Sequence, residues 1–378
     1  MKLFHLSDLH LGKRLNEFSL TEDQEYILKE ILTICDREKP DGVIVAGDIY
    51  DRSVPSEDAM TLWDDFLISL AKKGIPVYAI SGNHDSAVRF SDHGRLVDAA
   101  GIHLAPVYDG SILCCRAEDE FGPVNIYLLP FIKPAAVRSI FPDDEINDHT
   151  DACRVAIEHM NVDVSMRNVL IAHQFVTGAA RCDSEEVVVG GLDNVDASVF
   201  DPFDYVALGH IHGKQSIGRE TVRYCGTPLK YSFSEKDHVK SITVVELKEK
   251  GDITIDEIPL TPMHELREIR GTFEEIKEKG RGDEGDVNDY IHVILTDEND
   301  VIDAVSKLRI IYPNLMSLTY DNKRTREQRV ISDVKDIERK SPIDIFEEFY
   351  EKQNNQPMSD EQRDFIQECI ESVWRAGV

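Results

Sequence analysis

Five short polar motifs lie where predicted buried strands end, and no other sequence feature constrains the fold of the chain as strongly. The motifs are Asp8-Leu9-His10, Gly47-Asp48, Gly82-Asn83-His84-Asp85, Ala172-His173 and Gly209-His210-Ile211-His212. Each follows a short apolar run, the pattern of a strand that is buried on both faces. Strand ends of an α/β sheet converge on one edge, where functional groups collect. The sequence therefore predicts that the motifs meet at one site.

Strand and helix patterns alternate between the motifs, which is typical of an α/β fold. The predicted strands are Lys2–Leu6, Val43–Ala46, Val77–Ile80, Val169–Ala172 and Tyr205–Leu208, and the predicted helices are Asp23–Glu38 and Ala59–Ala71. Within the second helix we expect Leu62, Phe66 and Leu70 to face the core. Two later strands, Ser241–Leu247 and Ile253–Leu260, have no helix between them, which predicts an antiparallel addition that closes a sandwich.

The chain has 378 residues, more than one typical domain, and its character changes twice. Thr261-Pro262 marks the first boundary, so residues 1–260 form the α/β domain. Residues 261–340 predict a small α+β domain with strands His264–Gly271, Asp289–Leu295 and Leu315–Tyr320 and helices Thr272–Lys279 and Val301–Ile311. Residues 341–378 predict C-terminal helices, the last of which begins at a capping box of Ser359 and Gln362.

The net charge is -29, unlike the basic footprint of most nucleic-acid-binding proteins. On charge alone we favour an acidic enzyme with a small substrate. The alternative is that metal cations and a few arginines meet phosphates while a partner supplies the remaining charge. No apolar run has the length of a membrane span, and no signal peptide precedes the first motif. The seven cysteines are scattered without a C-x-x-C pair, which indicates reduced thiols in the cytosol.

The motifs carry seven side chains able to bind a metal: Asp8, His10, Asp48, Asn83, His173, His210 and His212. Aspartate and histidine suit divalent Mn, Fe or Zn, and the absence of cysteine argues against a structural zinc site. Two cations about 3.5–4 Å apart can clamp a phosphodiester. A carboxylate must bridge them, and an aspartate in the middle of the set can do so. Each motif alone is more often a loop or turn, but five at successive strand ends favour a metal centre.

The order of these motifs resembles that of the calcineurin-like metallophosphoesterases. The segments HLSDLHLGKRL, VIVAGDIYDRSVPS, ISGNHDSAVRFS, LGHIHGKQ and YCGTPLKYSFSE look like its SbcD branch, the nuclease subunits of bacterial SbcCD complexes. The resemblance covers at least Met1–Glu235, and the remainder matches in layout. It implies an α/β metallophosphoesterase β-sandwich flanked by helices, with a capping domain at 261–340 and C-terminal helices at 341–378.

The resemblance also implies a ligand scheme. Asp8, His10, Asp48 and His212 would hold one cation, and Asp48, Asn83, His173 and His210 the other, with Asp48 bridging. His84 would be the catalytic side chain that binds no metal, or alternatively would only orient a ligand. We expect Asp85 to hold a ligand or the loop. Some relatives carry a second histidine after the Gly-Asp motif, where this chain has Asp51-Arg52. That departure leaves the role of this loop open, although Arg52 could contact a phosphate.

The activity implied by the resemblance is that of a 3′-to-5′ exonuclease and endonuclease acting on DNA ends and hairpins. Two divalent cations, usually manganese, would support it, in the cytoplasm at the nucleoid. Lys13, Arg14 and Arg89 are candidate phosphate contacts or solvated surface charges. The implied assembly is a heterotetramer with an SbcC-type coiled-coil ATPase, in which a homodimer forms through helices near Ser56–Ala71 and Arg89–Ala100.

The C-terminal tail carries an apolar stripe at helical spacing. One apolar helical face is formed by Phe365, Ile366, Cys369, Ile370, Val373 and Trp374. We therefore expect Pro342–Gly377 to bind the base of the coiled coil or to fold back on the capping domain.

Two other functions compete with this interpretation. One competitor is a stand-alone phosphoesterase acting on nucleotides or phosphoproteins, which the acidic charge favours. The other is a catalytically silent scaffold that binds DNA ends, which the complete ligand set disfavours.

Overall fold

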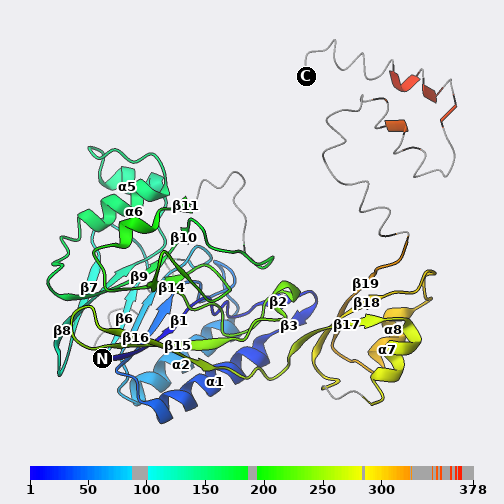
Figure 1. Cartoon of the computed structure of the whole chain (residues 1–378), viewed down its shortest axis with the longest axis horizontal. Coiled ribbons are helices and arrows are strands. Elements are labelled where there is room, and N and C mark those ends of the chain that lie inside the picture. Colours follow the sequence, from blue (N-terminus) through cyan, green and yellow to red (C-terminus); the bar gives the residue numbers. More distant parts are fainter. Residues whose placement is uncertain are drawn as a thin grey trace. The chain divides into compact units, whose positions relative to one another are not determined.

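The computed structural model describes residues 1–86, 101–185, 194–282 and 286–323, with separate residues between 325 and 367. It contains two compact units. The first comprises residues 1–269, 275–293 and 303–318, and the second comprises 270–274, 294–302 and the residues from 319 onward. All five polar motifs belong to the first unit and lie in the part of it that Figure 1 shows in blue to green.

The first unit is built on two six-stranded sheets, each with parallel strands at its centre. The first sheet has the order β16-β15-β1-β4-β5-β6. Its strands are β1 (Lys2–Leu6), β4 (Gly42–Ala46), β5 (Val77–Ile80), β6 (Ile102–Ala105), β15 (Ser241–Leu247) and β16 (Ile253–Pro259). Strands β1, β4, β5 and β6 are parallel, whereas β15 runs antiparallel to both β1 and β16. The two late strands are therefore antiparallel as predicted, and they extend one sheet beside β1.

The second sheet has the order β13-β14-β12-β9-β8-β7. Its strands are β7 (Leu113–Asp119), β8 (Gly122–Leu129), β9 (Arg167–His173), β12 (Tyr205–Gly209), β13 (Gln215–Ile217) and β14 (Arg219–Tyr224). The central strands β8, β9, β12 and β14 are parallel, and the edge strands β7 and β13 are antiparallel to their neighbours.

The sheets pack face to face, and helices cover their outer faces. Alternation along each strand produces these layers: on β1, Leu3 enters the core between the sheets while Phe4 enters the core under the helices. Helices α1 (Thr21–Glu38) and α2 (Glu57–Lys72) lie on one side of the sandwich (Figure 1). Helices α5 (Pro134–Ile140) and α6 (His149–Glu158) lie on the opposite side. The result is an α/β/β/α sandwich, which confirms the predicted fold class.

Helices α1 and α2 show why these segments are helical. In α1, Ile27, Ile31 and Ile34 recur at helical spacing and are buried. Helix α2 begins at Ser56, whose hydroxyl accepts the N–H of Ala59 at 3.3 Å. Its predicted stripe is confirmed, since Phe66 and Leu70 are buried and Leu62 packs against the same core.

The remaining elements are short. They are the pairs β2 (Arg14–Leu15) with β3 (Phe18–Ser19) and β10 (Phe175–Val176) with β11 (Asn194–Val195), and the 3-10 turns Ala197–Phe200 and Phe233–Glu235. A three-stranded sheet contains β17 (Leu266–Gly271), β18 (Tyr290–Leu295) and β19 (Leu315–Tyr320). Helices α7 (Phe273–Lys279) and α8 (Ala304–Arg309) complete the described elements. The predicted strands and helices of this α+β region are all found, within a few residues of their expected ends.

Polar contacts around Asp297 join segments of the second unit. Its carboxylate accepts the N–H of Phe273 at 2.8 Å, and its carbonyl accepts from the side chain of Asn322 at 3.0 Å. Farther along, Ser359 and Gln362 form the predicted capping box: each side chain accepts the other residue's N–H, at 3.3 and 3.0 Å.

Two predictions fall mostly outside the described residues. Most of the segment Pro342–Gly377 and the stretch Arg89–Ala100 lie outside them, so the tail helices and half of the expected dimer contact stay predictions. The three-domain division at residues 260 and 340 also stays a prediction. Among the described helices, none is both long enough and apolar enough to cross a membrane.

Candidate metal centre

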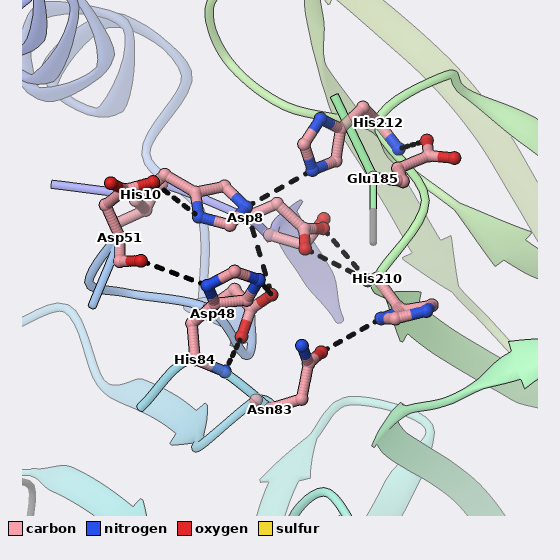
Figure 2. A network of polar contacts seen from close by, with 12 residues as sticks. Asp8, His10, Asp48, Asp51, Asn83, His84, Glu185, His210 and His212 are labelled. Atoms are coloured by element: carbon pink, nitrogen blue, oxygen red, sulfur yellow. Dashed lines mark hydrogen bonds and ion pairs between the residues drawn. The ribbon is translucent and has the colours of Figure 1, made fainter. Parts of the chain in front are cut away.

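The two sheets bring all seven predicted ligand side chains together at one edge of the sandwich. Asp8, His10, Asp48 and Asn83 follow strands of the first sheet, whereas His173, His210 and His212 lie at strand ends of the second. Figure 2 shows the side chains converging on a common space for Asp8, His10, Asp48, Asn83, His210 and His212. The convergence predicted from the strand ends is thus found, and the site is shared by both sheets.

The backbone of the motif loops is left-handed at four of the seven positions. The φ angles are 51° at Asp8, 43° at His10, 48° at Asp48 and 101° at His210. Non-glycine residues rarely adopt such angles, which cluster at functional sites and persist only where the surroundings hold them. Here backbone hydrogen bonds join the first two loops, from Asp8 N to Gly47 O at 3.0 Å and from His10 N to Asp48 O at 3.0 Å.

Three motif glycines allow the loops to approach one another. A Cβ on Gly82 would lie 2.1 Å from Asp48 Oδ1. A Cβ on Gly47, whose φ is +87°, would lie 2.3 Å from His173 Nδ1. On Gly209 it would lie 1.8 Å from the Ala46 carbonyl oxygen. Any other residue at these positions would displace the ligands, so the glycines belong to the architecture of the site.

The ligand atoms fall into two groups that meet at Asp48. One group is Asp8, His10 and His212, the other is Asp48, His173 and His210, and within each group the ligand atoms lie within 4.8 Å of one another. A third group within the same distance, His10, Asp48 and His84, also includes the imidazole of His84, which the ligand scheme leaves out. Between the groups, Asp48 Oδ2 lies 3.3 Å from His173 Nε2 and 3.8 Å from His10 Nε2. Asn83 Oδ1 joins the second group at 3.0 Å from both His173 Nε2 and His210 Nδ1.

The donor set fits divalent cations. In the first group the Nε2 atoms of His10 and His212 lie 3.2 Å apart, so two imidazole nitrogens face one buried space. In the second, His173 Nδ1 lies 2.8 Å from the Ala46 carbonyl, to which its N–H donates, leaving Nε2 for the site. Buried carboxylates and imidazoles that converge without thiolates match the preferences of Mn, Fe and Zn.

Asp48 and His173 shift each other's pKa values in opposite directions. Burial acts to raise the pKa of Asp48, but the charges of His173 and His10 outweigh it and hold that pKa below its ordinary value. Burial acts to lower the pKa of His173, but Asp48 reverses this and raises it to about 9. For His210, burial and the charge of His173 lower the pKa to about 3. A cation at this position would displace the proton of His173, so binding would release a proton.

His84 stands beside the ligands, and Asp85 holds the loops. The N–H of His84 donates to Asp48 Oδ1 at 2.9 Å, and its Nδ1 lies 3.0 Å from the Asp51 carbonyl oxygen. Its Nε2, 3.9 Å from Asp48 Oδ2, points into the site from a side chain that is 20% exposed. The Asp85 carboxylate accepts N–H groups from Ile49, Tyr50 and Gly82, at 3.1, 2.9 and 2.9 Å. Of the two roles expected for Asp85, it therefore holds the loop.

The structure also shows the contacts of Asp51 and Arg52, whose role the sequence leaves open. Asp51 forms an ion pair with Lys13 at 2.7 Å and lies 3.7 Å from His10 Nδ1. The Arg52 side chain is 77% exposed. Lys13 is thus paired within the site, and Arg14 donates to the carbonyl of Glu17. The third candidate phosphate contact, Arg89, lies outside the described residues.

Four residues near the site were not predicted. Ser184, Glu185 and Glu235 contact or support His212, and the Arg181 guanidinium stacks on Phe175 at 3.6 Å. Figure 2 shows Glu185 beside His212. Glu235 ends the segment YCGTPLKYSFSE, but nothing in that segment indicates its role, and no spacing signal marks the other three residues.

Comparisons with known proteins agree with this geometry. Residues 1–214 match the calcineurin-like phosphoesterase family, and residues 262–354 match the type 5 capsule protein repressor C-terminal domain. The D subunit of the nuclease SbcCD from Staphylococcus epidermidis (strain ATCC 12228 / FDA PCI 1200) is 32% identical over 379 residues, which cover 99% of each chain.

Two solved structures are also similar. A crystal structure of a Thermus thermophilus protein gives a TM-score of 0.40 at 10% identity, over 68% of this chain and 98% of that one. A dimetal phosphatase from Danio rerio gives a TM-score of 0.44 at 12% identity, over 70% and 98%. The family and relative matches decide the assignment: the chain is a metal-dependent phosphodiester hydrolase of the calcineurin-like phosphoesterase family and belongs to its SbcD branch.

Proposed function

We propose that this chain is the nuclease subunit of an SbcCD-type complex and hydrolyses DNA phosphodiesters with two divalent cations. One observation carries the proposal: a chain similar over 99% of its length to the SbcD subunit of an SbcCD nuclease gathers seven ligand-competent side chains in one site. The finer activities, 3′-to-5′ exonuclease and endonuclease action on DNA ends and hairpins, belong to the same proposal.

In the proposed scheme each group of side chains holds one cation. Asp8, His10 and His212 would hold the first, and His173 and His210, with Asn83, the second. Asp48 would bridge them, and its position between the two groups supports that role. When bound, the cations supply a clamp for the phosphate and lower the pKa of a water molecule, and manganese is the proposed metal.

His84 is the proposed catalytic residue. If its Nδ1–H donates to the Asp51 carbonyl, 3.0 Å away, Nε2 remains the atom available to substrate. In its protonated form, Nε2 can donate to a phosphate oxygen or to the leaving oxygen. The backbone N–H of His84 also fixes Asp48 Oδ1, so the motif both positions a ligand and presents the imidazole.

The acidic charge of the chain is consistent with DNA contacts that are shared between this chain and a partner protein. With a net charge of -29, the chain would meet DNA through its cations and a few local basic groups, while a coiled-coil ATPase of the SbcC type supplies further contacts. A homodimer within a heterotetramer, acting at the nucleoid in DNA repair, recombination and replication, is the assembly we propose. The segment Pro342–Gly377 would bind the ATPase.

The test offers purified protein a labelled DNA hairpin with Mn²⁺ or Mg²⁺, with and without the partner ATPase. We expect metal-dependent cleavage that the ATPase stimulates, and none after chelation. A nucleotide monoester and a phosphopeptide are offered in parallel, because the acidic charge favours a stand-alone phosphoesterase. Turnover of those substrates without cleavage of DNA would select that alternative. Binding of DNA ends without any hydrolysis would select a silent scaffold.

A further inference from the structure

The Nδ1 side of His212 leads away from the other ligands into a chain of polar groups. His212 Nδ1 lies 2.7 Å from Ser184 Oγ, and Ser184 Oγ lies 2.6 Å from Glu235 Oε1. Glu235 is fully buried, and its other oxygen, Oε2, lies 2.5 Å from Lys240 Nζ. Three segments that are distant in the sequence thus meet behind one proposed metal ligand.

Only one direction of hydrogen bonding is possible along this series of polar groups from His212 to Lys240. The Glu235 carboxylate, paired with the Lys240 ammonium, can only accept, so the single hydroxyl proton of Ser184 is donated to it. The Ser184 oxygen is then left to accept the Nδ1–H of His212. The ring is thereby held as the tautomer whose Nε2 lone pair faces His10 and the site.

The backbone of His212 is fixed by the same surroundings. Its N–H donates to Glu185 Oε1 at 2.7 Å. Its carbonyl accepts from Lys240 Nζ at 3.0 Å and from the N–H of Thr227 at 3.2 Å. Lys240 also donates to Thr227 Oγ1 at 2.7 Å, so its three protons are all used. Both the orientation and the position of the ring are determined by these contacts.

His212 and His173, another proposed ligand, differ in the groups that orient their rings. His173 is oriented by a main-chain carbonyl, that of Ala46, which no substitution of a side chain removes. His212 is oriented by two replaceable side chains. Groups that orient metal-binding histidines typically change metal affinity about 10–100-fold when they are removed.

We propose that Ser184 and Glu235 are positioning residues that form a carboxylate–hydroxyl relay, which sets the tautomer and orientation of His212 for the cation it shares with Asp8 and His10. The proposal rests on the proposed metal-binding function of that group. It assigns a role to the last residue of the segment YCGTPLKYSFSE, which the ligand scheme leaves unused.

The experiment titrates chelated, full-length protein with Mn²⁺ and measures the two dissociation constants by calorimetry. We expect Ser184→Ala to weaken one of the two sites about 10–100-fold and to leave the other unchanged. Ser184→Thr keeps the hydroxyl and should restore the affinity. Ser165→Ala is the matched control, because Ser165 also donates to a carboxylate, that of Asp163 at 2.7 Å, but away from the site.

A double-mutant cycle tests whether the two residues act as one relay. If Glu235 acts through Ser184, adding Glu235→Gln to Ser184→Ala should weaken binding no further than Ser184→Ala alone. Additive losses would show independent effects and overturn the relay. Cobalt substitution gives a second readout, since a reoriented His212 would change the d–d absorption of one site.

Failures of the relay and of the metal scheme are distinguishable. If His212→Ala loses one site but Ser184→Ala binds both ions like the wild type, the relay is wrong and the metal scheme stands. If His212→Ala also binds both ions normally, the scheme itself is wrong. A lower Tm of chelated Ser184→Ala with unchanged affinities would mean a purely structural serine and would also overturn the relay.

Discussion

Replacing Asp85 by alanine should loosen the loop that carries Asp48, because one carboxylate there accepts three backbone N–H groups. Oδ2 accepts from Ile49 at 3.1 Å and Gly82 at 2.9 Å, and Oδ1 accepts from Tyr50 at 2.9 Å. All three donors belong to buried residues. Two of them follow Asp48 directly, so their release would free the backbone at the proposed bridging ligand.

The magnitude follows from the number of donors. A buried donor left without an acceptor costs about 1–3 kcal/mol, and water entering the vacated space recovers part of this. We therefore expect Asp85→Ala to destabilise the protein by about 3–5 kcal/mol. For a folded chain of this size that corresponds to a fall in Tm of about 4–8 °C. Asp85→Asn keeps one acceptor oxygen and should lose about 1–3 kcal/mol, because one donor then faces an NH₂ group.

The assay combines thermal unfolding with metal content by mass spectrometry. Asp163→Ala is the control: among the described residues that carboxylate accepts from Ser165 alone, at an exposed turn, and its loss should cost no more than about 0.5 kcal/mol. Asp85→Ala should also bind less metal. If its Tm stays within about 1 °C of the wild type and both cations remain bound, the three hydrogen bonds do not hold the loop and the reasoning fails.

Four further outcomes are expected. Asp48→Ala should abolish hydrolysis and remove more metal than any other single ligand change; a variant that keeps both ions and normal turnover, by mass spectrometry and assay, would contradict the bridging role. His84→Ala should keep metal and DNA binding while losing about 10²–10⁴-fold in turnover, and a parallel loss of metal would make it a ligand or an orienter. Burial lowers the pKa of His5 from 6.5 to about 3, so as pH falls from 6.5 toward 3 the unfolded chain gains a proton that the folded chain does not, and stability is lost. His5→Gln should therefore flatten the dependence of Tm on pH in that window, and an unchanged slope would refute this. Truncation after Tyr350 should leave Tm and cleavage of short DNA intact but weaken binding to the ATPase; a sharp fall in Tm with unchanged binding would place the tail in the core.

Parallel strands buried on both faces were the most predictable part of the fold. Val77–Ile80 is a continuous apolar run, and Lys2–Leu6 is apolar at Leu3, Phe4 and Leu6; the observed bounds of both strands are those predicted. The β7–β8 hairpin was not predicted. Its edge strand Leu113–Asp119 is mostly solvent-facing, so it carries polar and charged side chains instead of an apolar run. Edge strands of this kind leave a weak periodic signal.

The candidate site likewise has features that the sequence predicts and features that it does not. The motifs predicted its ligand-competent residues because strand ends of a sheet share an edge. The relay behind His212 could not be predicted, because Ser184 and Glu235 are 51 residues apart and meet only in the folded chain. The left-handed backbone angles at Asp8 and Asp48 could not be predicted either, because an aspartate in a sequence does not indicate a positive φ as a glycine does.

The sharing of the site between two sheets has a consequence for how activity first arises. His10 and His212 face each other across 202 residues of sequence, one carried by each half of the sandwich. A growing or truncated chain that ends before His212 lacks a ligand for the first proposed cation. Cations that bind only the assembled sandwich also stabilise it, by about 2.7 kcal/mol at a concentration of 100 times Kd. In the proposed scheme, hydrolytic capacity would therefore arise only when the fold is complete, and a partly folded chain would carry no nuclease centre that could damage DNA.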